Sequence, residues 1–258
     1  MRLLAIPAFE DNYIWALADD DGDALIVDPG DAAPVIAATD MGLWPAAVLV
    51  THHHPDHRGG VAVLRERWPT LPVFAPEDAR IPEATERVGE GSKITLKNWK
   101  LSVLEVPGHT SSHIAFHGGG QDQRHLFCGD TLFSLGCGRM FEGTPAQMLT
   151  SLDRLAALPG DTTVCCGHEY TLSNAAFARI VDPANPALLQ LIQEAQSMRQ
   201  SGRPTLPSTL ARETAANPFL RTHNPAIQAA VARRLGRAPA DRVETFAELR
   251  RWKDDFRG

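Results

Sequence analysis

Short apolar runs divided by turn residues dominate residues 1–170 and predict a succession of β-strands. Turn-forming residues such as Asp20-Asp21-Gly22 separate the runs. The expected strands are residues 3–6, 13–17, 24–27, 46–50, 73–74, 93–96, 101–106, 114–116, 125–128 and 162–166. Apolar positions at helical spacing lie between them and predict helices at residues 34–38, 59–68 and 145–158.

The strand pattern stops beyond about residue 171, where helical spacing takes over. Helices are expected at residues 187–200, 224–235 and 243–256, joined by loops rich in Pro, Gly and Arg. The pattern therefore predicts an α/β domain at residues 1–170, followed by a smaller helical domain at residues 171–258.

Three consecutive glycines, Gly118 to Gly120, fall between two expected strands. A glycine-rich segment can bind phosphate, but the Lys-Ser/Thr pair of a phosphate-binding loop does not follow here. We therefore expect a hairpin turn at these glycines.

The segment after strand 46–50 is the richest in reactive side chains and reads Thr51-His52-His53-His54-Pro55-Asp56-His57. In extended backbone His52 and His54 point the same way, and the histidine between them points the other way. The proline stiffens the turn that carries Asp56 and His57 to a second position. Imidazole and carboxylate groups suit a borderline divalent metal, and four or more of them exceed what one catalytic ion needs. The segment therefore predicts two metal ions.

Three later segments share a pattern in which an apolar run ends, a glycine follows and a metal-binding residue type comes next. Each would deliver one ligand to the same end of the sheet as the histidine segment. The segments are Val106-Pro107-Gly108-His109, Phe127-Cys128-Gly129-Asp130 and Cys165-Cys166-Gly167-His168.

Composition narrows the class of protein. The chain has 258 residues, 43% of them hydrophobic, and a formal net charge of -6, which argues against nucleic-acid binding by bulk electrostatics. We read neither a membrane span nor a signal peptide in it. Four cysteines without a Cys-x-x-Cys pair predict buried, reduced thiols, and hence a cytoplasmic enzyme. We expect a monomer.

The motifs together resemble the metallo-β-lactamase fold superfamily and, within it, the hydroxyacylglutathione hydrolases, also called glyoxalase II. The resemblance covers nearly the whole chain. It lies in residues 11–15, 28–30, 51–57, 107–110, 129–133, 136–144, 167–170 and 249–254. It implies an αββα sandwich followed by a helical substrate-binding domain, with two divalent ions, zinc first and iron or manganese as alternatives.

The resemblance also implies the ligands and the reaction. One metal would be held by His52, His54 and His109, and the other by Asp56, His57 and His168. Asp130 would bridge them. The implied reaction is hydrolysis of S-D-lactoylglutathione to glutathione and D-lactate by a metal-bridged hydroxide, the second step of methylglyoxal detoxification.

Asp56 and Asp130 are the expected catalytic carboxylates, because Asp56 can orient the nucleophile and Asp130 serves both ions. Glu169 is expected to orient His168. By resemblance the substrate-binding residues are Arg139, Phe141, Tyr170, Arg250 and Lys253. Many relatives carry Lys at the Arg139 position and Tyr at the Phe141 position, so no hydroxyl role is assigned to Phe141. The alternative for Arg250 and Lys253 is that they lie on a solvated helix face and have no binding role.

Other readings remain open at this point. The same fold serves lactonases, β-lactamases and phosphodiesterases, although β-lactamases usually lack a histidine at the His57 position. A single-iron persulfide dioxygenase is a redox alternative, although it does not normally carry a long helical C-terminal domain. A metal-stabilised interaction module is the non-enzymatic alternative, but it would need coordinatively closed sites.

Overall fold

The computed structural model of the protein describes residues 1–120 and 123–257 and divides into two compact units. Unit 1 comprises Met1–Glu105, Ser112–Gly129 and Cys165–His168. Unit 2 comprises Val106–Ser111, Asp130–Val164 and Glu169–Gly258. The chain therefore passes between the units several times, each time close to one of the glycine-containing segments that carry His109, Asp130 and His168.

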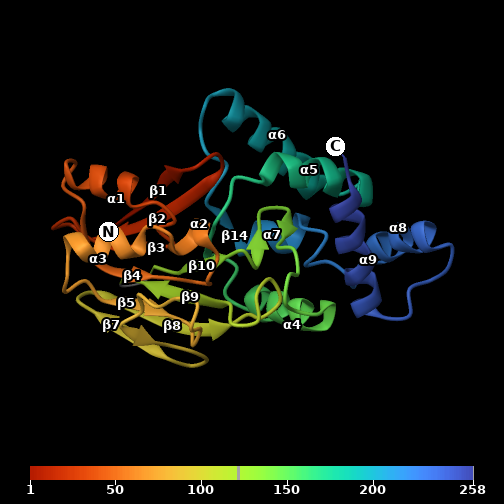
Figure 1. Cartoon of the computed structure of the whole chain (residues 1–258). Helices are drawn as coiled ribbons and strands as arrows, with labels where there is room; N and C mark the ends of the chain where they lie inside the picture. The colour runs from red at the N-terminus through yellow and green to blue at the C-terminus, as the bar shows by residue number, and fades with distance from the viewer. Residues whose placement is uncertain (121–122, 258) are drawn as a thin grey trace. The chain divides into compact units, whose positions relative to one another are not determined.

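The first sheet of unit 1 is mixed (Figure 1). Its six strands, in spatial order, are β1 (Arg2–Ala8), β2 (Asn12–Ala18), β3 (Asp23–Val27), β4 (Trp44–Leu49), β5 (Val73–Ala75) and β6 (Glu86–Arg87). The first three are antiparallel neighbours, and the pairs from β3 to β6 are parallel. Helices α1 (Ala32–Thr39) and α3 (Val61–Arg67) lie in the crossovers from β3 to β4 and from β4 to β5, and they share one buried apolar cluster with the sheet.

The second sheet of unit 1 is an antiparallel meander. Its strands are β7 (Lys93–Leu96), β8 (Trp99–Glu105), β9 (Ile114–Gly119) and β10 (His125–Gly129), beside which Cys165 and Cys166 end β13 (Thr163–Cys166). Both cysteines are buried, as are the chain's other two, so the expectation of packed thiols is confirmed. The expected strands and sandwich-type sheets are confirmed as well, within one or two residues at most ends.

The hairpin between β9 and β10 forms as expected, but its turn was placed too early. Gly118 and Gly119 still belong to β9. A Cβ at Gly118 would lie 2.2 Å from the Lys100 carbonyl oxygen on β8, so this glycine allows close strand approach instead of a turn. Residues 121–122 of the connection lie outside the described residues.

Unit 2 is mostly helical. Its elements are β11 (Leu132–Phe133), β12 (Gly136–Cys137), α4 (Pro145–Ala156), α5 (Thr171–Val181), α6 (Pro186–Gln200), β14 (Ser208–Thr209), α7 (Leu210–Ala216), α8 (Pro225–Leu235) and α9 (Arg242–Asp255). The remaining short helix, α2 (Pro55–Arg58), belongs to unit 1. The four expected helices, α4, α6, α8 and α9, are confirmed. In the described parts of the chain, every helix is too short or too polar to cross a lipid bilayer.

Two expectations about residues beyond 171 were wrong. The strand signal does not stop there, because β14 pairs antiparallel with the first residues of β13. Two residues are too few for any alternation, so this pairing is visible only in the tertiary structure. Helices α5 and α7 were also missed, since α5 begins after Tyr170 with no side-chain cap and α7 spans only seven residues.

A buried polar cluster fixes the β11–β12 hairpin in unit 2. The side-chain amide of Asn217 donates to the carbonyl oxygens of Phe133 and Gly136 at 3.0 and 2.9 Å. The fully buried carboxylate of Glu213 accepts from the backbone N–H of Leu135 at 2.8 Å. These bonds satisfy the polar groups of a short hairpin that has no neighbouring strand to pair with.

Replacing Asn217 with alanine is expected to lower the free energy of unfolding by about 2–4 kcal/mol, because two buried carbonyl groups lose their donor. Chemical denaturation followed by circular dichroism measures the change. Asn98→Ala is the matched control, since Asn98 is exposed, and its effect should stay within about 0.5 kcal/mol. Equal effects of the two changes would show that the amide of Asn217 does not hold the hairpin.

Candidate metal centre and substrate pocket

The histidine segment of unit 1 begins where β4 ends. Nε2 of His52 lies 3.1 Å from Nδ1 of His54, so the two rings converge as strand alternation predicted. Two ligand atoms about 2.1 Å from a tetrahedral zinc ion lie about 3.4 Å apart, so this spacing fits a shared ion. The ring of His53 lies elsewhere, with Nδ1 3.6 Å from a carboxylate oxygen of Asp78.

A second group of metal-binding side chains in unit 1 consists of Asp56, His57 and His168. Their ligand atoms all lie within 4.8 Å of one another. Oδ2 of Asp56 is 3.5 Å from Nε2 of His57 and 3.4 Å from Nε2 of His168. Two imidazoles and one carboxylate at this spacing form a donor set that a divalent transition metal accepts. The two histidines lie more than 100 positions apart in the sequence, and the tertiary fold brings them together.

Asp28 orients two of these rings through a buried network. Its carboxylate accepts from the Thr51 hydroxyl at 2.7 Å and from Nδ1 of His57 at 3.0 Å. Because the hydroxyl of Thr51 gives its proton to Asp28, its oxygen accepts from Nδ1 of His52, 3.0 Å away. Both histidines therefore carry the proton on Nδ1 and turn the Nε2 lone pair outward, as a metal-binding imidazole requires.

Asp11 plays the corresponding part for His168. Its Oδ1 lies 2.8 Å from Nδ1 of His168, so Asp11 takes the orienting role that we expected of Glu169. The carboxylate of Glu169 instead accepts hydrogen bonds from the backbone N–H and hydroxyl of Thr205. The expectation was wrong because adjacency in sequence does not determine which carboxylate meets a ring nitrogen.

Replacing Asp28 with asparagine is expected to weaken metal binding 10- to 100-fold, the effect typical of residues that orient a metal ligand. The amide cannot accept from both Thr51 and His57 with the strength of a carboxylate. Competition with a chromophoric chelator measures the change. Asp31→Asn is the control, because Asp31 caps α1 and asparagine caps a helix equally well. Unchanged affinity in Asp28→Asn would remove the orienting role.

Unit 2 holds the other two expected ligands, His109 and Asp130. Nδ1 of His109 donates to the carbonyl oxygen of Arg139 at 2.8 Å, which leaves its Nε2 as the acceptor. That Nε2 lies 3.5 Å from Oδ2 of Asp130. This distance again matches two ligands of one ion.

The residue before Asp130 has to be glycine. Gly129 adopts a φ of +47°, and a Cβ there would lie 2.3 Å from the Thr51 hydroxyl oxygen and 2.9 Å from the ring of His113. Any larger residue would clash with Thr51, at the start of the histidine segment, and would be strained in its backbone. The glycine that marked this motif in the sequence therefore has a steric cause.

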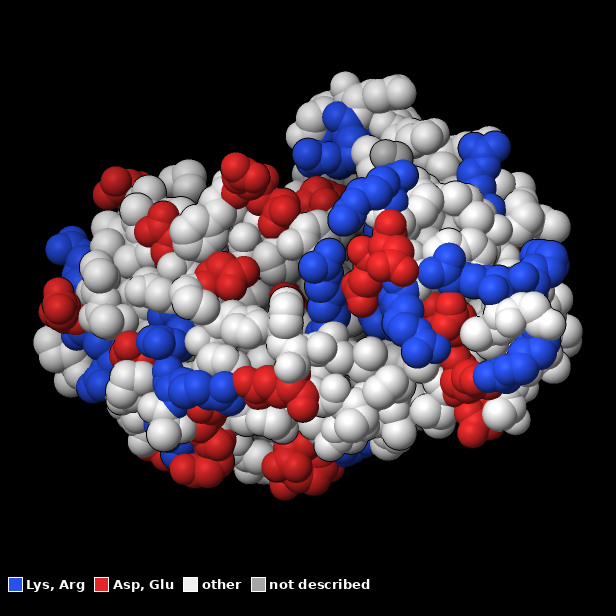
Figure 2. All heavy atoms as spheres, turned by 45° about the vertical axis from the view of Figure 1, so that its right-hand side comes forward, with Lys and Arg blue, Asp and Glu red and all other residues white. Residues whose placement is uncertain are grey.

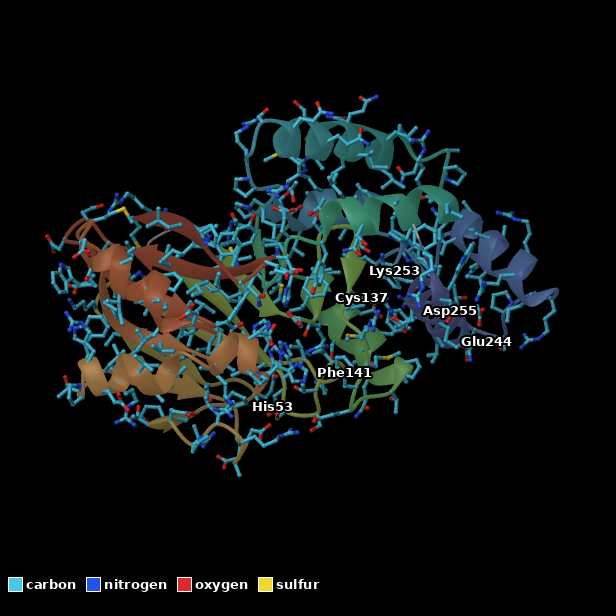
Figure 3. The ribbon with its side chains drawn as sticks, turned by 45° about the horizontal axis from the view of Figure 1, so that its top comes forward. His53, Cys137, Phe141, Glu244, Lys253 and Asp255 are labelled. Carbon is cyan, nitrogen blue, oxygen red and sulfur yellow. The ribbon has the colours of Figure 1, made fainter. Side chains whose placement is uncertain are left out.

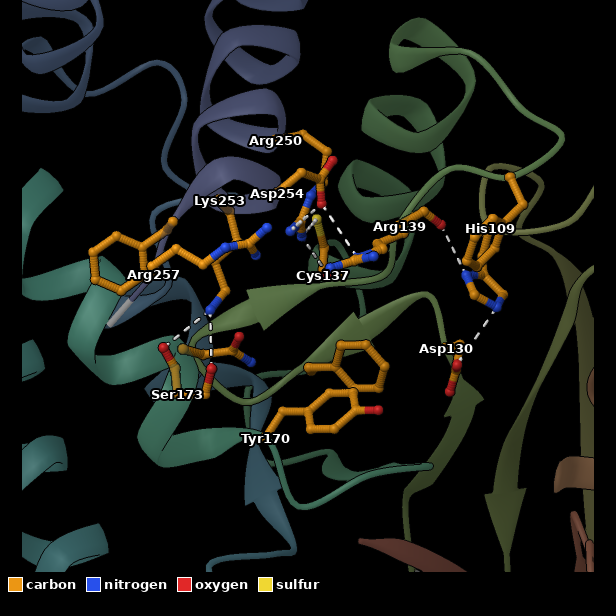
Figure 4. Close-up of a pocket in the computed structure, with 14 residues that line it drawn as sticks. His109, Asp130, Cys137, Arg139, Tyr170, Ser173, Arg250, Lys253, Asp254 and Arg257 are labelled. Atoms are coloured by element: carbon orange, nitrogen blue, oxygen red, sulfur yellow. Dashed lines mark hydrogen bonds and ion pairs between the residues drawn. The ribbon is translucent and has the colours of Figure 1, made fainter.

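A pocket of about 430 Å³ lies within unit 2, a volume in the range of small-molecule sites. Basic side chains gather with acidic ones between them on this face of the C-terminal helices (Figure 2). The structure brings all five expected substrate-binding residues into its lining, together with the two ligands of unit 2 (Figure 4). The seven are His109, Asp130, Arg139, Phe141, Tyr170, Arg250 and Lys253.

Arg250 and Lys253 do not form a solvated helix face. Arg250 is only 4% exposed, donates to the carbonyl oxygen of Cys137 at 2.7 Å and lies over the ring of Phe219. Lys253 donates to the carbonyl and hydroxyl oxygens of Ser173 at 3.0 and 3.1 Å. These hydrogen bonds offset part of the cost of burying the two cations beside a cavity.

Burial lowers the pKa of Lys253 to about 8, and the positive charges of Arg250 and Arg139 act in the same direction. The nearby Asp254 carboxylate opposes the shift. Lys253 is therefore cationic at neutral pH and loses its charge as the pH rises through about 8. The pocket attracts anions best below that value.

Comparison with known proteins places this arrangement in a family. The model of the metallo-beta-lactamase superfamily matches residues 10–168, and that of the hydroxyacylglutathione hydrolase C-terminus matches residues 169–256. The chain is 62% identical to the hydroxyacylglutathione hydrolase of Xanthomonas axonopodis pv. citri (strain 306), over 100% of both chains. The chain belongs to the hydroxyacylglutathione hydrolase family. It is also 58% identical to the enzyme of that name from Xylella fastidiosa (strain M23), over 99% of this chain and 98% of that one.

Solved structures show that this family member has the metallo-β-lactamase fold, as expected. ETHE1 from Myxococcus xanthus is 23% identical with a TM-score of 0.65, over 99% of this chain and 91% of that one. The BLEG-1 B3 metallo-beta-lactamase is 24% identical with the same TM-score, over 85% and 99%. TTHA1623 in a di-iron-bound form is 26% identical with a TM-score of 0.59, over 85% and 100%.

Sequence reasoning missed several residues of the hydroxyacylglutathione hydrolase site. Asp28 follows an apolar run and precedes Pro29-Gly30, the same kind of pattern that marked the ligands, so it could have been found. Asn12 donates to Oδ2 of Asp56 at 3.1 Å, and Asp254 lies in the pocket beside Arg250. Helical spacing could have paired Asp254 with Arg250, four residues earlier, but no such spacing marks Asn12.

Proposed function

We propose that the chain hydrolyses the thioester of S-(2-hydroxyacyl)glutathione, with S-D-lactoylglutathione as its substrate. The products are glutathione and a 2-hydroxy acid, D-lactate, and the reaction is the second step of methylglyoxal detoxification. The observation that carries the proposal is full-length identity of 62% to an enzyme named for this reaction, in a chain that keeps the donor set and a cationic pocket.

We further propose that two divalent ions are held by the seven residues expected from the sequence, with zinc first and iron or manganese as alternatives. The residues are His52, His54 and His109 for one ion, Asp56, His57 and His168 for the other, and Asp130 for both. Support comes from donor spacings of 3.1–3.5 Å within each unit and from the ring orientations that Asp28 and Asp11 impose. When bound, such ions polarise a carbonyl group and lower the pKa of water.

The other requirements of the reaction are orientation of the attacking water and departure of the leaving group. Asp56 receives a hydrogen bond from Asn12 on the oxygen that faces His57 and His168, so its carboxylate is held in place to orient the attacking water. The leaving group is a thiolate, which is stable near neutral pH, so no side chain has to protonate it. Asp56 and Asp130 are accordingly the proposed catalytic carboxylates.

We assign recognition of the glutathione moiety to Arg139, Phe141, Tyr170, Arg250 and Lys253. Arg250 keeps donors beyond those given to Cys137 and Asp254, and Lys253 is cationic at neutral pH, so a substrate carboxylate is well matched. The ring of Phe141 contacts that of His109, with centroids 5.3 Å apart, and offers an apolar wall. We propose residues 171–258 as the substrate-binding domain, and a cytoplasmic monomer as the working form.

The test pairs metal analysis of the gently purified protein with thioester hydrolysis. We expect close to two transition-metal ions per chain and rapid release of thiol from S-D-lactoylglutathione, with much slower turnover of a β-lactam, a lactone and a phosphodiester. Oxygen uptake with glutathione persulfide as the substrate tests the alternative that the protein is a persulfide dioxygenase. Absence of thioester hydrolysis in the metal-loaded protein would refute the proposed function, and full activity with one ion would refute the two-ion site.

A further inference from the structure

The carboxylate of Asp254 lies among the cations of the pocket, whereas the other carboxylate in the lining, Asp130, is an expected metal ligand. Asp254 follows Lys253 on α9, and its side chain reaches the pocket together with four basic residues (Figure 4). The four are Arg139, Arg250, Lys253 and Arg257. A negative charge at this site repels an anionic substrate and by itself weakens its binding. The carboxylate is therefore expected to have a second role that offsets this repulsion.

The contacts of Asp254 indicate what this role is. Its Oδ1 accepts from Nη2 of Arg250 at 3.0 Å and lies 3.4 Å from Nε of Arg139. Arg139 is 62% exposed and stands on the loop after β12, whereas Arg250 is buried on α9. One oxygen atom of Asp254 therefore links an exposed guanidinium to one that is buried on the helix.

We propose that Asp254 is a positioning residue for substrate binding: its carboxylate holds the guanidinium groups of Arg139 and Arg250 where both meet a carboxylate of the substrate. The inference rests on the proposed function, because it takes the glutathione moiety as the occupant of the pocket. It adds to that function a residue that touches no substrate and acts through two that do.

We expect the positioning effect of Asp254 on substrate binding to outweigh its repulsion of the substrate carboxylate. Hydrogen bonds between ionised partners are roughly twice as strong as neutral ones, and a held side chain loses less conformational entropy on binding. The repulsion between Asp254 and a substrate carboxylate acts partly through solvent, because Asp254 is 39% exposed. Loss of Asp254 should therefore weaken binding even though it removes a like charge.

Asp254 also influences the charge of Lys253. It favours the protonated lysine, against burial and the charges of Arg250 and Arg139. The other ionisable side chains that line the same pocket are His109, Asp130, Cys137, Tyr170 and Arg257. Without the Asp254 charge, Lys253 loses its proton at lower pH, so the KM for the substrate starts to rise at lower pH than in the wild type.

The test compares Asp254→Asn with Asp255→Asn in the metal-loaded enzyme. Both changes remove one negative charge from the end of α9, but Asp255 pairs with Arg234 of α8 and does not line the pocket (Figure 3). We expect Asp254→Asn to raise the KM for S-D-lactoylglutathione about 10-fold, with kcat within about 2-fold of wild type. Calorimetry with glutathione itself should show an affinity loss of about 10-fold, or about 1.4 kcal/mol.

A purely structural role of Asp254 would not move the pH dependence, so KM is measured from about pH 6 to about pH 9. We expect the rise of KM to begin at lower pH in Asp254→Asn and to keep its wild-type position in Asp255→Asn. If the wild type is active but Asp254→Asn has the same KM as Asp255→Asn, or binds the substrate more tightly, this inference is refuted and the proposed function is not. A metal-loaded wild type that leaves the thioester intact overturns the proposed function and the inference with it.

Discussion

Asp130→Ala is expected to lose metal and to reduce kcat/KM for S-D-lactoylglutathione on the order of 1000-fold or more. Asp130 is the one carboxylate assigned to both ions, and in unit 2 its Oδ2 lies 3.5 Å from Nε2 of His109. Metal ions supply several kcal/mol of transition-state stabilisation, and each 1.36 kcal/mol lost is a factor of ten. Metal content by mass spectrometry and steady-state kinetics measure the two effects.

His53→Ala is the matched control from the histidine segment. The ring of His53 lies near Asp78, away from the converging nitrogens of His52 and His54. Metal content should be unchanged, and activity should change no more than is typical of a residue that does not bind the ion. Loss of metal in His53→Ala with retention in Asp130→Ala would overturn the proposed ligand set.

The Arg250→Ala, Lys253→Ala double variant is expected to lower kcat/KM for S-D-lactoylglutathione about 10-fold or more, which is about 1.4 kcal/mol or above. Both side chains line the pocket that also contains His109 and Asp130, and their proposed role is to bind a part of the substrate remote from the reacting carbonyl. Activity on a small thioester without glutathione should barely change, because such a substrate makes no contact with them. Metal content should stay at the wild-type level.

Arg250 is buried, so its removal could also disturb folding. Arg233→Ala with Arg251→Ala is the control, because it also removes two positive charges, but from exposed positions: Arg233 lies on α8, and Arg251 lies on α9, the helix that carries Arg250 and Lys253. It should leave both substrates unaffected. Equal losses on the glutathione thioester and the small thioester in the double variant would indicate a defect of site assembly and refute a glutathione pocket at this place.

Much of the fold could be predicted because local patterns have local causes. The continuous apolar runs became strands, and β2 is buried at all seven positions, as expected of a strand covered on both faces. Pro145 stands at the first position of α4, after Thr144, whose hydroxyl accepts from the backbone N–H of Gln147. Two of the missed elements lack such causes: β14 needs its partner strand, and α5 lacks a side-chain cap.

The sequence by itself determined which residue types can bind metal and where the chain must turn to present them. The convergence of His52 and His54 follows from strand alternation. This is an effect of neighbouring residues, so it can be read from one segment, whereas the steric reason for Gly129 is its contact with the distant Thr51.

Only the tertiary structure decided how those residues are held. Asp28 and Asp11 are distant in sequence from the rings that they orient, and Asp254 is distant from Arg139, and nothing in their neighbourhood predicts these pairings. It also showed that Arg250 is buried beside Cys137 and that Lys253 has a lowered pKa. Burial and partner choice depend on packing between distant segments, and helical or strand periodicity carries no information about which distant segment arrives.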